Sequence, residues 1–420
     1  MYYPRKIEAT LRAVSETFPA LVLTGPRQVG KTTLLQSMAD SNRKYVDLSN
    51  PTDRNLAITE PEMFLQRYSP PVTIDEVQYA PGLLDYIKVH ADKYKKAGDF
   101  WLTGSQTFHL MKNVTESLAG RAGIVRMLGL SNSEIDGTGF GPFQVDPQAL
   151  IRRMDDAKPL TLTEVFTRIF TGSFPRLYEN LNVDRKTFYE SYLETYISRD
   201  VRDLTQVADE LSFLRFINVV AARTATNLNY ETLANETGIS SPTAKQWLSI
   251  LVSGGLVALI PPYANNVLKR VIKAPRMYFL DTGLCAYITR MNSPEFLEAS
   301  AMDGAFFETW VVSEIYKSYL HCGERPPLFF YRDQNKKEID LIIHQNNAVH
   351  PIEIKKGAAP KDAVKHFSVL RPIAEDPNDE DLFSGAAHLK TEIGAGAVVC
   401  LASNVLPIDK KNWYVPAWLI

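Results

Sequence analysis

The chain contains few residues that could form disulfides or hold zinc. Among 420 residues there are three cysteines, Cys285, Cys322 and Cys400, and none lies close to another in sequence. This spacing provides no disulfide framework and no thiolate zinc site, which is typical of a reducing compartment. The seven histidines include no H-x-x-x-H pair. The sequence therefore predicts neither a secreted disulfide scaffold nor a zinc enzyme.

Long uninterrupted apolar runs are also missing. The N-terminal stretch "MYYPRKIEATL" has no apolar signal core, so we expect a cytoplasmic protein. The stretch from Trp247 to Leu268 carries no charge and is long enough to cross a bilayer. It contains Gly254-Gly255 and Pro261-Pro262, which would leave unpaired backbone groups in hydrocarbon. We expect a buried helix, a turn and a strand here, and no contact with a membrane.

Neither sign of charge is in excess. Lys and Arg total 46, Asp and Glu total 48, and the formal net charge is -2. This balance excludes a globally basic nucleic-acid coat but permits a local basic patch. The length and the 45% hydrophobic content predict roughly three domains of about 150 residues each.

Short apolar segments alternate with helical ones through the first third of the chain. The segments with strand character are Leu21–Gly25, Lys44–Ser49, Val72–Glu76, Phe100–Ser105 and Ile124–Leu128. Near-continuous apolar strands separated by helices predict an α/β fold with a parallel sheet covered on both faces. The polar stretch Ser131–Lys158 then indicates a boundary or a mobile insertion.

The loop after the first of these segments carries a phosphate-binding motif. "GPRQVGKT" matches G-x-x-x-x-G-K-[ST], in which loop amides surround phosphate oxygens, Lys31 reaches the β- and γ-phosphates, and Thr32 supplies a hydroxyl to Mg²⁺. The glycines let the backbone approach the phosphates closely. The residues expected at the nucleotide are Gly25, Pro26, Arg27, Gln28, Val29, Gly30, Lys31, Thr32 and Thr33.

A pair of carboxylates follows the third segment. "PVTIDEVQYAP" ends its apolar run in Asp75 and Glu76, an arrangement typical of a Walker B motif. Asp75 would act through water on Mg²⁺, and Glu76 would polarise the attacking water.

Two further positions predict roles in hydrolysis. In "FWLTGSQT", Thr103 or Ser105 could contact the γ-phosphate or position water as a sensor residue does. In "ESLAGRAGIVRML", Arg121 lies in a glycine-flanked loop and could stabilise transition-state charge in a neighbouring subunit. A polar strand end and an ordinary surface arginine are the alternatives.

Residues 1 to about 130 resemble the AAA-type ATPase core, and the whole chain resembles prokaryotic AAA-family ATPases that end in domain of unknown function 4143. The segments that carry the resemblance are "TGPRQVGKTTLL", "VTIDEVQ", "WLTGSQ", "SLAGRAG", "TGSFPRL" and "KEIDLII…PIEIKKG". The resemblance implies that Gly172 and Pro175 form a lid turn at the adenine. Serine stands here where the family often has a second glycine, and no clear second sensor arginine is visible beyond Arg176.

Residues Tyr230–Val257 have helix–turn–helix spacing. Gly238 is expected at the turn, Ser240 or Ser241 would cap a second helix, and Trp247 lies on that helix's apolar face. A strand and a basic stretch follow, which together predict a winged helix with a basic wing. The cations expected to contact nucleic acid are Lys245, Lys269, Arg270, Lys273 and Arg276. A winged-helix unit that only packs against its neighbours is the alternative.

The last third has the order of a restriction-nuclease-like fold. A helix at Gly304–Leu320 carries Glu308, and two strands follow. A period of two places Glu338, Asp340 and Ile342 on one face of the first strand and Ile339, Leu341 and Ile343 on the other. Glu353 and Lys355 share a face of the second strand, and a covering helix is expected after Gly357.

Asp340, Glu353 and Lys355 form the pattern D…E-x-K of PD-(D/E)-x-K nucleases, with Glu308 completing the acidic cluster. Carboxylates of this kind hold a divalent cation against a phosphodiester while the lysine orients water. A charged outer strand face and an inactive docking platform are the alternatives.

These predictions combine into one architecture. A P-loop AAA-type core (1–160) is followed by a helical lid (161–205), a winged helix (206–299) and an α/β nuclease-like domain (300–420). The expected activity is Mg²⁺-dependent ATP hydrolysis coupled to nucleic-acid binding or processing, with DNA favoured, in a homo-oligomer that could be a hexameric ring. The alternative is a nucleotide-gated switch or protein-remodelling ATPase whose nuclease-like domain docks a partner.

Overall fold

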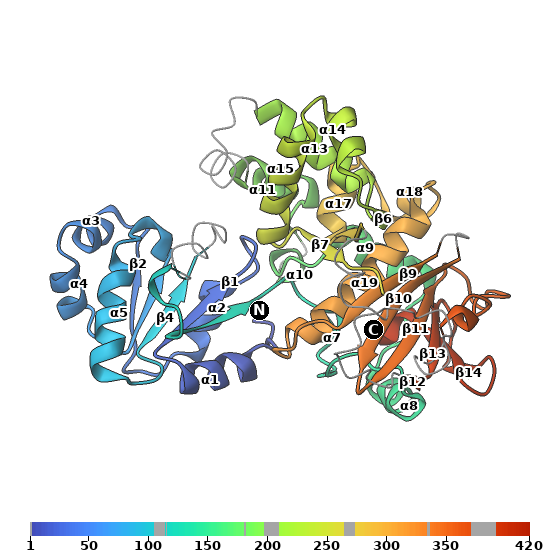
Figure 1. The fold of residues 1–420 in the computed structure, drawn as a ribbon, viewed down its shortest axis with the longest axis horizontal. Helices are drawn as coiled ribbons and strands as arrows, with labels where there is room; N and C mark the ends of the chain where they lie inside the picture. The colour runs from blue at the N-terminus through green and yellow to red at the C-terminus, as the bar shows by residue number, and fades with distance from the viewer. Residues whose placement is uncertain are drawn as a thin grey trace, which may run out of the picture.

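The computed structural model describes residues 2–104, 114, 116–179, 182–196, 210–263, 274–333, 337–370 and 392–420. Figure 1 shows three regions: the N-terminal strands and helices lie on the left, a group of helices lies above, and the C-terminal sheet lies on the right.

The N-terminal region is built on a parallel sheet with the strand order β2-β3-β4-β1-β5. Its strands are β1 (Ala20–Thr24), β2 (Lys44–Asp47), β3 (Val72–Asp75), β4 (Phe100–Thr103) and β5 (Ala122–Arg126). All five predicted strands are present and all pair in parallel. The predicted α/β class and parallel sheet are therefore confirmed.

Helices cover both faces of this sheet. Strand β1 is buried along its whole length because alternate side chains serve different cores: Ala20 and Val22 pack in one apolar cluster, while Leu21 and Leu23 pack in another with Leu34. The first face is covered by α3 (Pro51–Thr59), α4 (Pro61–Arg67) and α5 (Leu83–Tyr94), and the second by α1 (Glu8–Thr17) and α2 (Lys31–Met38).

The stretch after β5 forms two helices, α7 (Asn132–Asp136) and α8 (Pro147–Asp156). Ser131 and Glu134 form a capping box at the start of α7, and Asp146 caps α8. The guanidinium of Arg153 donates to the carbonyl of Leu419, 2.9 Å away at the end of the chain. The interpretation of Ser131–Lys158 as a mobile insertion is therefore wrong, because local caps and a distant partner fix it.

A helical region with a small sheet follows. Its helices are α9 (Leu162–Thr171), α10 (Arg176–Glu179), α11 (Arg185–Tyr196), α13 (Glu210–Ala222), α14 (Tyr230–Thr237), α15 (Ser241–Ser253), α17 (Thr282–Ile288) and α18 (Pro294–Glu298). The strands β6 (Thr226–Asn227), β7 (Val257–Ile260) and β8 (Arg276–Phe279) form an antiparallel sheet in the order β6-β8-β7.

The two helices and the turn predicted around Gly238 are present. Gly238 ends α14 with a φ of 80°, and the Ser240 side chain caps α15. Trp247 is buried on the inner face of α15, as its spacing predicts. In the described part of the uncharged stretch after Trp247, residues 248–263, the chain forms the end of α15 and then β7, and most of its apolar side chains are buried.

The C-terminal region contains one long helix and a mixed sheet. Helix α19 (Asp303–Leu320) precedes β9 (Leu328–Arg332), β10 (Glu338–Gln345), β11 (Ala348–Ile354), β12 (Glu392–Ile393), β13 (Gly396–Cys400), β14 (Leu406–Pro407) and β15 (Asn412–Pro416). Strands β9, β10 and β11 are antiparallel neighbours, whereas β11, β13 and β15 run parallel. The predicted helix–strand–strand order is present.

Two sequence predictions in this region are wrong. The register of β10 shifts between Ile339 and Ile342, so these two side chains share one apolar cluster while Leu341 and Ile343 belong to another. A bulge breaks the period of two and re-aims the side chains beyond it. The covering helix expected after Gly357 is instead a series of turns ending in a short 3₁₀ segment, Phe367–Val369.

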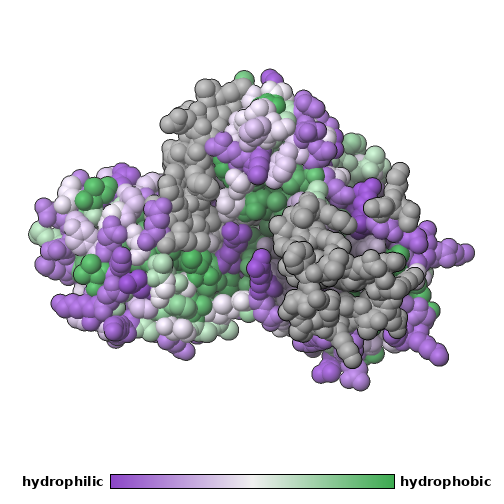
Figure 2. Space-filling model, in the orientation of Figure 1, coloured by the Kyte–Doolittle hydropathy of each residue, from purple (hydrophilic) through white to green (hydrophobic). Residues whose placement is uncertain are grey.

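One apolar cluster runs through all three regions and joins them. It includes Leu23 of the parallel sheet, Trp247 of α15, and Val311 of α19. In Figure 2 polar residues dominate the outer face, whereas apolar surface gathers near the middle, where the N-terminal region meets the rest. Within the described ranges, no helix is both long enough and apolar enough to cross a membrane.

Candidate functional site

The loop between β1 and α2 has a backbone that requires glycine at both ends of the motif. Gly25 has a φ of 139°, and a Cβ atom there would lie 1.9 Å from the carbonyl oxygen of Met127 on the neighbouring segment. Gly30 has a φ of 93° and precedes the first turn of α2. Residues other than glycine rarely adopt these positive φ angles. The loop is therefore held open at the N-terminus of a helix, where anions bind favourably.

Lys31 folds back over this loop. Its side chain is buried, and Nζ donates to the carbonyls of Gly25 at 2.9 Å and Pro26 at 2.7 Å. The ammonium group is thereby positioned at the loop by backbone contacts.

Thr32 and Asp75 meet at the end of β3. The Thr32 hydroxyl donates to Asp75 Oδ2 at 2.7 Å, although the two residues lie 43 positions apart in sequence. Burial is the largest of the causes that raise the pKa of Asp75, because a desolvated carboxylate loses hydration. A hydroxyl and a carboxylate are oxygen ligands of the kind that Mg²⁺ prefers, directly or through water. This pair therefore fits the Mg²⁺ site that the motifs imply.

Tyr45 is a contact that sequence reasoning missed. Its hydroxyl donates to the same Asp75 Oδ2 at 3.0 Å, and burial followed by the charge of Asp75 raises its pKa. Tyr45 reaches Asp75 because β2 is the neighbour of β3 in the sheet. The sequence shows only that Tyr45 lies in a predicted strand. The contact could not be predicted, because the sequence does not reveal which strands are neighbours in the sheet.

Glu76 follows Asp75 at the mouth of the site. Its backbone has a φ of 53°, an uncommon value for a residue other than glycine, and the amide of Gln78 donates to its Oε2. Gln78 is a second contact that the sequence did not single out. Together they orient the carboxylate that is expected to polarise water.

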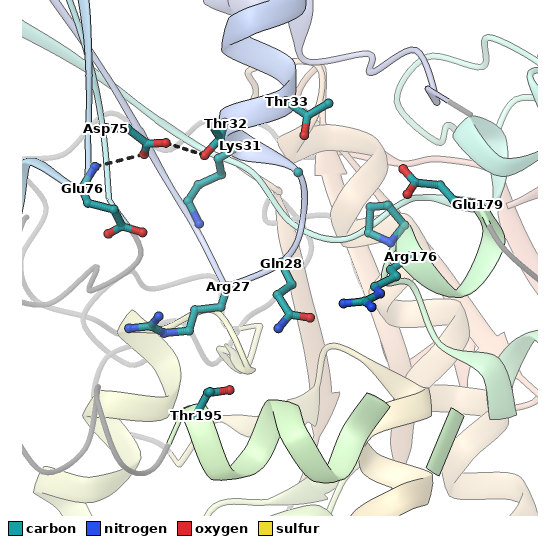
Figure 3. A pocket seen from close by; sticks show the side chains of 12 residues that line it. Arg27, Gln28, Lys31, Thr32, Thr33, Asp75, Glu76, Arg176, Glu179 and Thr195 are labelled. Atoms are coloured by element: carbon teal, nitrogen blue, oxygen red, sulfur yellow. Dashed lines mark hydrogen bonds between the residues drawn. The ribbon is translucent and has the colours of Figure 1, made fainter. Parts of the chain in front are cut away.

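A cavity of ≈ 520 Å³ opens beside these groups, within the size range of small-molecule sites. The loop and the Asp75–Glu76 pair line one side, and Pro175, Arg176 and Thr195 line the other. In Figure 3 the side chains of Arg27, Gln28 and Arg176 lie between the loop and the helices opposite. The cavity therefore combines phosphate-loop geometry with several cations.

The structure separates the two residues of the predicted lid turn. Pro175 lines the cavity, but Gly172 does not. A Cβ atom at Gly172 would lie 2.3 Å from the Tyr189 hydroxyl and 2.6 Å from Asp281 Oδ1. Gly172 thus lies outside the cavity lining and allows close packing of α9 against α11 and α17, and its contact with the nucleotide stays a prediction.

The predicted sensor residues and the arginine predicted to act on a neighbouring subunit lie in different surroundings. Thr103 is buried at the end of β4, and its hydroxyl has no hydrogen-bond partner within the described ranges. Ser105 lies outside the described residues. Arg121 is partly exposed and forms a bidentate pair with Asp92 of α5, at 2.5 and 3.0 Å. The structure therefore places Arg121 on the surface of its own subunit.

The C-terminal acidic residues meet where α19, β10 and β11 converge. Asp340 Oδ2 accepts from the Ile354 amide at 2.9 Å and lies 3.4 Å from Lys355 Nζ. Lys355 also pairs with Glu353 Oε1 at 2.7 Å. Glu308 belongs to the same group, since the charge of Asp340 is the second cause, after burial, that raises its pKa to about 7. The tertiary structure thus brings together all four residues of the predicted pattern.

Arg276 is the most important correction. It was expected on an exposed basic wing, but it is only 4% exposed. Its guanidinium lies 3.1 Å from Glu308 Oε1 and 3.7 Å from Asp340 Oδ1, and it also pairs with Glu338. An arginine in this position is not available to a nucleic acid. Among the other cations predicted to contact nucleic acid, Lys245 is exposed on α15, whereas Lys269, Arg270 and Lys273 lie outside the described residues.

Comparisons with known families divide the chain into three matches. Residues 17–136 match a family model described as an AAA domain. Residues 162–295 match a domain of unknown function, DUF8612, and residues 303–420 match the domain of unknown function DUF4143. The chain therefore carries an AAA-type domain followed by DUF4143, and the resemblance identified from sequence is confirmed.

The similar proteins extend over most of the chain. The uncharacterized protein Rv2008c of Mycobacterium tuberculosis is 27% identical over 357 residues, covering 85% of this chain and 74% of its own. The uncharacterized protein Mb2031c of Mycobacterium bovis matches to the same extent. A solved structure of the Walker-type ATPase PABY2304 of Pyrococcus abyssi is similar at 16% identity and a TM-score of 0.41, covering 68% of this chain and 96% of that one.

Proposed function

We propose that this chain, an AAA-type ATPase that ends in DUF4143, binds ATP with Mg²⁺ at the Gly25–Thr33 loop and hydrolyses it to rearrange the regions that follow. The observation that carries the proposal is the 2.7 Å contact between Thr32 and Asp75 on the rim of a ≈ 520 Å³ cavity. A P-loop hydroxyl and a strand-end carboxylate meet where a triphosphate and its cation would lie.

Each group has a defined part in this reaction. Backbone amides of the loop and the start of α2 bind the phosphates, and Lys31 moves from the Gly25 and Pro26 carbonyls onto the β- and γ-phosphates. Thr32 and Asp75 would hold a Mg²⁺ ion, with Tyr45 orienting the carboxylate. Bound there, the ion would neutralise charge that develops on the phosphates. Glu76 orients the attacking water and accepts its proton.

The remaining predicted groups complete the site in an oligomer. Arg121 would leave Asp92 and reach the nucleotide of a neighbouring subunit, where an arginine stabilises transition-state charge. Its position on the surface supports this role, since a residue that acts on another subunit must be accessible. Ser105 remains the proposed sensor, and Arg176, which lines the cavity, the proposed contact from the lid. The proposed assembly is a homo-oligomeric ring.

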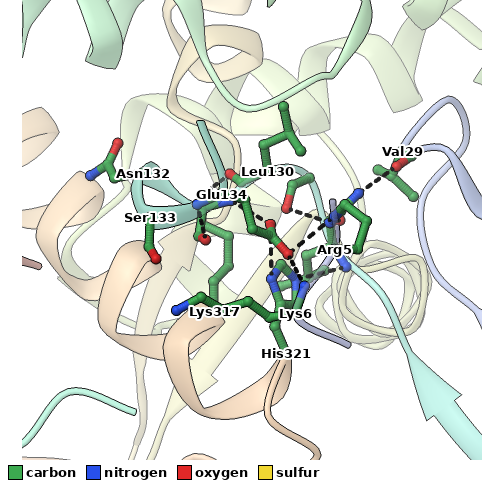
Figure 4. Close-up of polar contacts among 12 residues, drawn as sticks. Arg5, Lys6, Val29, Leu130, Asn132, Ser133, Glu134, Lys317 and His321 are labelled. Carbon is green, nitrogen blue, oxygen red and sulfur yellow. Dashed lines mark hydrogen bonds and ion pairs between the residues drawn. The ribbon is translucent and has the colours of Figure 1, made fainter. Parts of the chain in front are cut away.

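A buried charged cluster connects the nucleotide loop to DUF4143. Figure 4 shows Arg5, Glu134, Lys317 and His321 close together. We call these four residues, with Glu314 that pairs with Lys317, the junction cluster. Arg5 donates to the Val29 carbonyl within the P-loop at 2.9 Å and pairs with Glu134 at 3.1 Å. The same guanidinium donates to the Leu128 carbonyl at 2.8 Å. One buried side chain therefore contacts both the loop and the segment that leaves β5.

Helix α19 completes this connection. His321 Nδ1 lies 3.3 Å from Glu134 Oε2, and Nε2 accepts from the Leu128 amide at 3.4 Å. Burial is the largest cause that lowers the pKa of His321, which favours the neutral form of the ring. Lys317 Nζ donates to the Leu130 carbonyl at 2.7 Å. A movement of the loop on hydrolysis would therefore change the contacts of α19.

The loop also touches the helical region. A Cβ atom at Gly255, between α15 and β7, would lie 3.1 Å from the Pro26 ring. Leu128, Ala258 and Leu280 form a small apolar cluster with two residues of α19. These contacts support a coupling in which the nucleotide state is transmitted to both following regions.

The proposed output is nucleic-acid binding through residues 206–299. Along the chain, helix α13 is followed by β6, then by helices α14 and α15, and then by β7 and β8, and the three strands form an antiparallel sheet in the order β6-β8-β7. This order supports the proposal of a winged helix. Lys245 on the exposed face of α15 would contact a phosphate, as would Lys269, Arg270 and Lys273. The proposed division of the chain into a core, lid, winged helix and nuclease-like domain remains that given by the sequence.

A second candidate function is favoured by Arg276. An arginine among the carboxylates of the nuclease-like domain favours a nucleotide-gated switch in which this domain docks a partner and does not cleave.

Nucleotide turnover by the purified full chain tests the proposal. We expect Mg²⁺-dependent ATP hydrolysis; a folded chain with no affinity for ATP or GTP would contradict it. Single-stranded, duplex and branched nucleic acids are then added at low salt. Stimulated turnover supports the nucleic-acid output, whereas unchanged turnover without binding supports the docking switch.

The coupling is tested separately by amide hydrogen exchange of α19 with and without a non-hydrolysable ATP analogue. We expect protection in α19 to change on nucleotide binding in the unaltered chain and in Arg12→Lys, an exposed control on α1. In Arg5→Lys, which cannot keep the same fork of contacts, the response is expected to be lost. An unchanged response would show that the junction cluster does not couple the sites.

A further inference from the structure

The acidic cluster of DUF4143 carries its own cations. Four carboxylates meet there, those of Glu308, Glu338, Asp340 and Glu353. The C-terminal region supplies Lys355, and strand β8 of the preceding region supplies Arg276. A divalent cation bound by a PD-(D/E)-x-K site would need the same carboxylate oxygens.

Arg276 is held in the cluster by its backbone and by its side chain. Strand β8 pairs with β6 and β7 on either side, so the Cα position of Arg276 is fixed by two ladders. The guanidinium lies over the Phe330 ring, 5.0 Å from its centroid, as well as against the carboxylates. The Glu308 carboxylate that pairs with Arg276 also accepts from the Tyr278 hydroxyl at 2.7 Å. Neighbours from three elements therefore define the place of this side chain.

The carboxylates do not fit a metal as they are arranged. No group of three or more His, Cys, Asp or Glu side chains among the described residues converges to hold a metal ion. Asp340 Oδ2 is already engaged by the Ile354 amide and by Lys355, and Oδ1 faces Arg276. The implied nuclease cation therefore conflicts with the side chains present.

The charge imbalance and burial of the cluster favour protonated carboxyl groups. Two cations do not neutralise four carboxylates, and burial followed by the charge of Asp340 raises the pKa of Glu308 and of Glu353 to about 7. Glu353 Oε2 is buried without a hydrogen-bond partner in the described chain, which is far less costly for a protonated carboxyl than for a charged one.

We infer that Arg276 and Lys355 are the resident cations of this cluster in place of a divalent metal, and that Arg276 clamps β8 of residues 162–295 to β10 and α19 of DUF4143. The clamp is reinforced by backbone contacts, because Phe330 of β9 exchanges hydrogen bonds with Pro261 and Tyr263 at 3.1 and 2.6 Å. DUF4143 is then a domain fixed to the helical region and not a metal-dependent nuclease. This inference deepens the docking alternative above and does not depend on ATP hydrolysis.

The test is a Mn²⁺ titration of the full chain without nucleotide, followed by calorimetry, in an Asp75→Asn background that removes the ATPase carboxylate. Asp75→Asn and Asp75→Asn/Asp340→Asn are expected to bind Mn²⁺ with affinities within twofold of each other. Binding at least tenfold tighter in the first than in the second would place a metal at Asp340 and overturn the inference. This comparison does not require any change at Arg276.

The reciprocal experiment removes the clamp. Adding Arg276→Gln to the Asp75→Asn chain is expected to create a Mn²⁺ site at least tenfold tighter, which Asp340→Asn then abolishes. Lys245→Gln removes a cation from an exposed position of the same region and is expected to create no site. A folded Arg276→Gln chain without a new site would show that Arg276 does not occupy the place of a metal; if that variant fails to fold, the first comparison decides alone.

Discussion

The molecule has two acidic sites at strand ends, and they differ in where their cation comes from. At the end of β3, Asp75 faces an open cavity and its partners are the hydroxyls of Thr32 and Tyr45. At the C-terminal cluster, Asp340 is packed beneath β8 and faces Arg276 and Lys355 of the same chain. The first site is arranged to receive a cation with a ligand, whereas the second already contains its cations.

The difference arises from access and not from residue type. Both sites combine an aspartate, a glutamate and a lysine near a strand end, so their sequence patterns are similar. At the site beside β3, Lys31 Nζ donates to backbone carbonyls of the loop, and Asp75 and Glu76 line an open cavity. At the C-terminal cluster, a strand from another region covers the carboxylates. A carboxylate pattern therefore predicts chemistry only when the neighbouring elements leave it accessible.

The largest effect expected concerns turnover at the open site. Glu76→Gln removes the group that accepts a proton from water, and we expect ATP turnover to fall by roughly 10²–10⁴-fold while ATP affinity changes little. Turnover is measured by phosphate release and affinity by nucleotide titration. Glu62→Gln, on the exposed surface of α4, is the matched control. Unaltered turnover in Glu76→Gln would remove Glu76 from this role.

The next effect concerns stability at the closed site. Arg276→Gln leaves buried carboxylates without their partner, so we expect a loss of about 3–5 kcal/mol in the free energy of unfolding of the C-terminal regions. Urea unfolding followed by tryptophan fluorescence measures this loss. Lys245→Gln, which removes an exposed cation, is expected to change it by no more than about 0.5 kcal/mol. Equal losses of unfolding free energy in the two variants would show that Arg276 does not stabilise the C-terminal cluster.

A smaller effect is a pH dependence confined to the closed site. The folded-state pKa of Glu308 is about 7, above its ordinary value of 4.5, so the folded chain binds more protons between these values than the unfolded chain. The stability that this group contributes is present below pH 4.5 and is lost as the pH rises through 7. We expect a decline on the order of 1–3 kcal/mol across this window.

Urea unfolding at a series of pH values checks this decline. Glu308→Gln cannot titrate and is expected to reduce the decline to the part that Glu353 contributes, whereas Glu62→Gln is expected to retain the full decline. A rise in stability over the same window, abolished by Glu308→Gln, would mean that the carboxylate is favoured in its charged form.

The smallest effect is expected at Tyr45. Tyr45→Phe removes one hydrogen bond to Asp75 worth about 0.5–1.5 kcal/mol, so the Mg²⁺ concentration that supports half-maximal turnover should rise by roughly 2–10-fold. Tyr68→Phe removes a hydroxyl that contacts Asp53, away from the cavity, and serves as the control. If the Mg²⁺ requirement of Tyr45→Phe is unchanged, Tyr45 has a structural role and does not contribute to Mg²⁺ binding.

The open site was the more predictable one. Gly25, Gly30, Lys31 and Thr32 lie within eight positions, and their backbone conformations and roles are set by neighbours in sequence. The five strands could be predicted equally well, because a buried parallel strand has a short, nearly continuous apolar sequence. Of the predictions that failed, those at the β10 bulge and at Arg276 depended on a partner from a distant element.

The sequence by itself determined the phosphate loop, the strand-end carboxylates and the alternation of strands and helices, because glycine geometry and apolar periodicity act over a few residues. Only the tertiary structure decided that Tyr45 meets Asp75, that Arg5 links the loop to α19, and that Arg276 enters the acidic cluster. These contacts join residues tens to hundreds of positions apart. Such contacts depend on the order and packing of whole helices and strands, which a local sequence pattern does not predict.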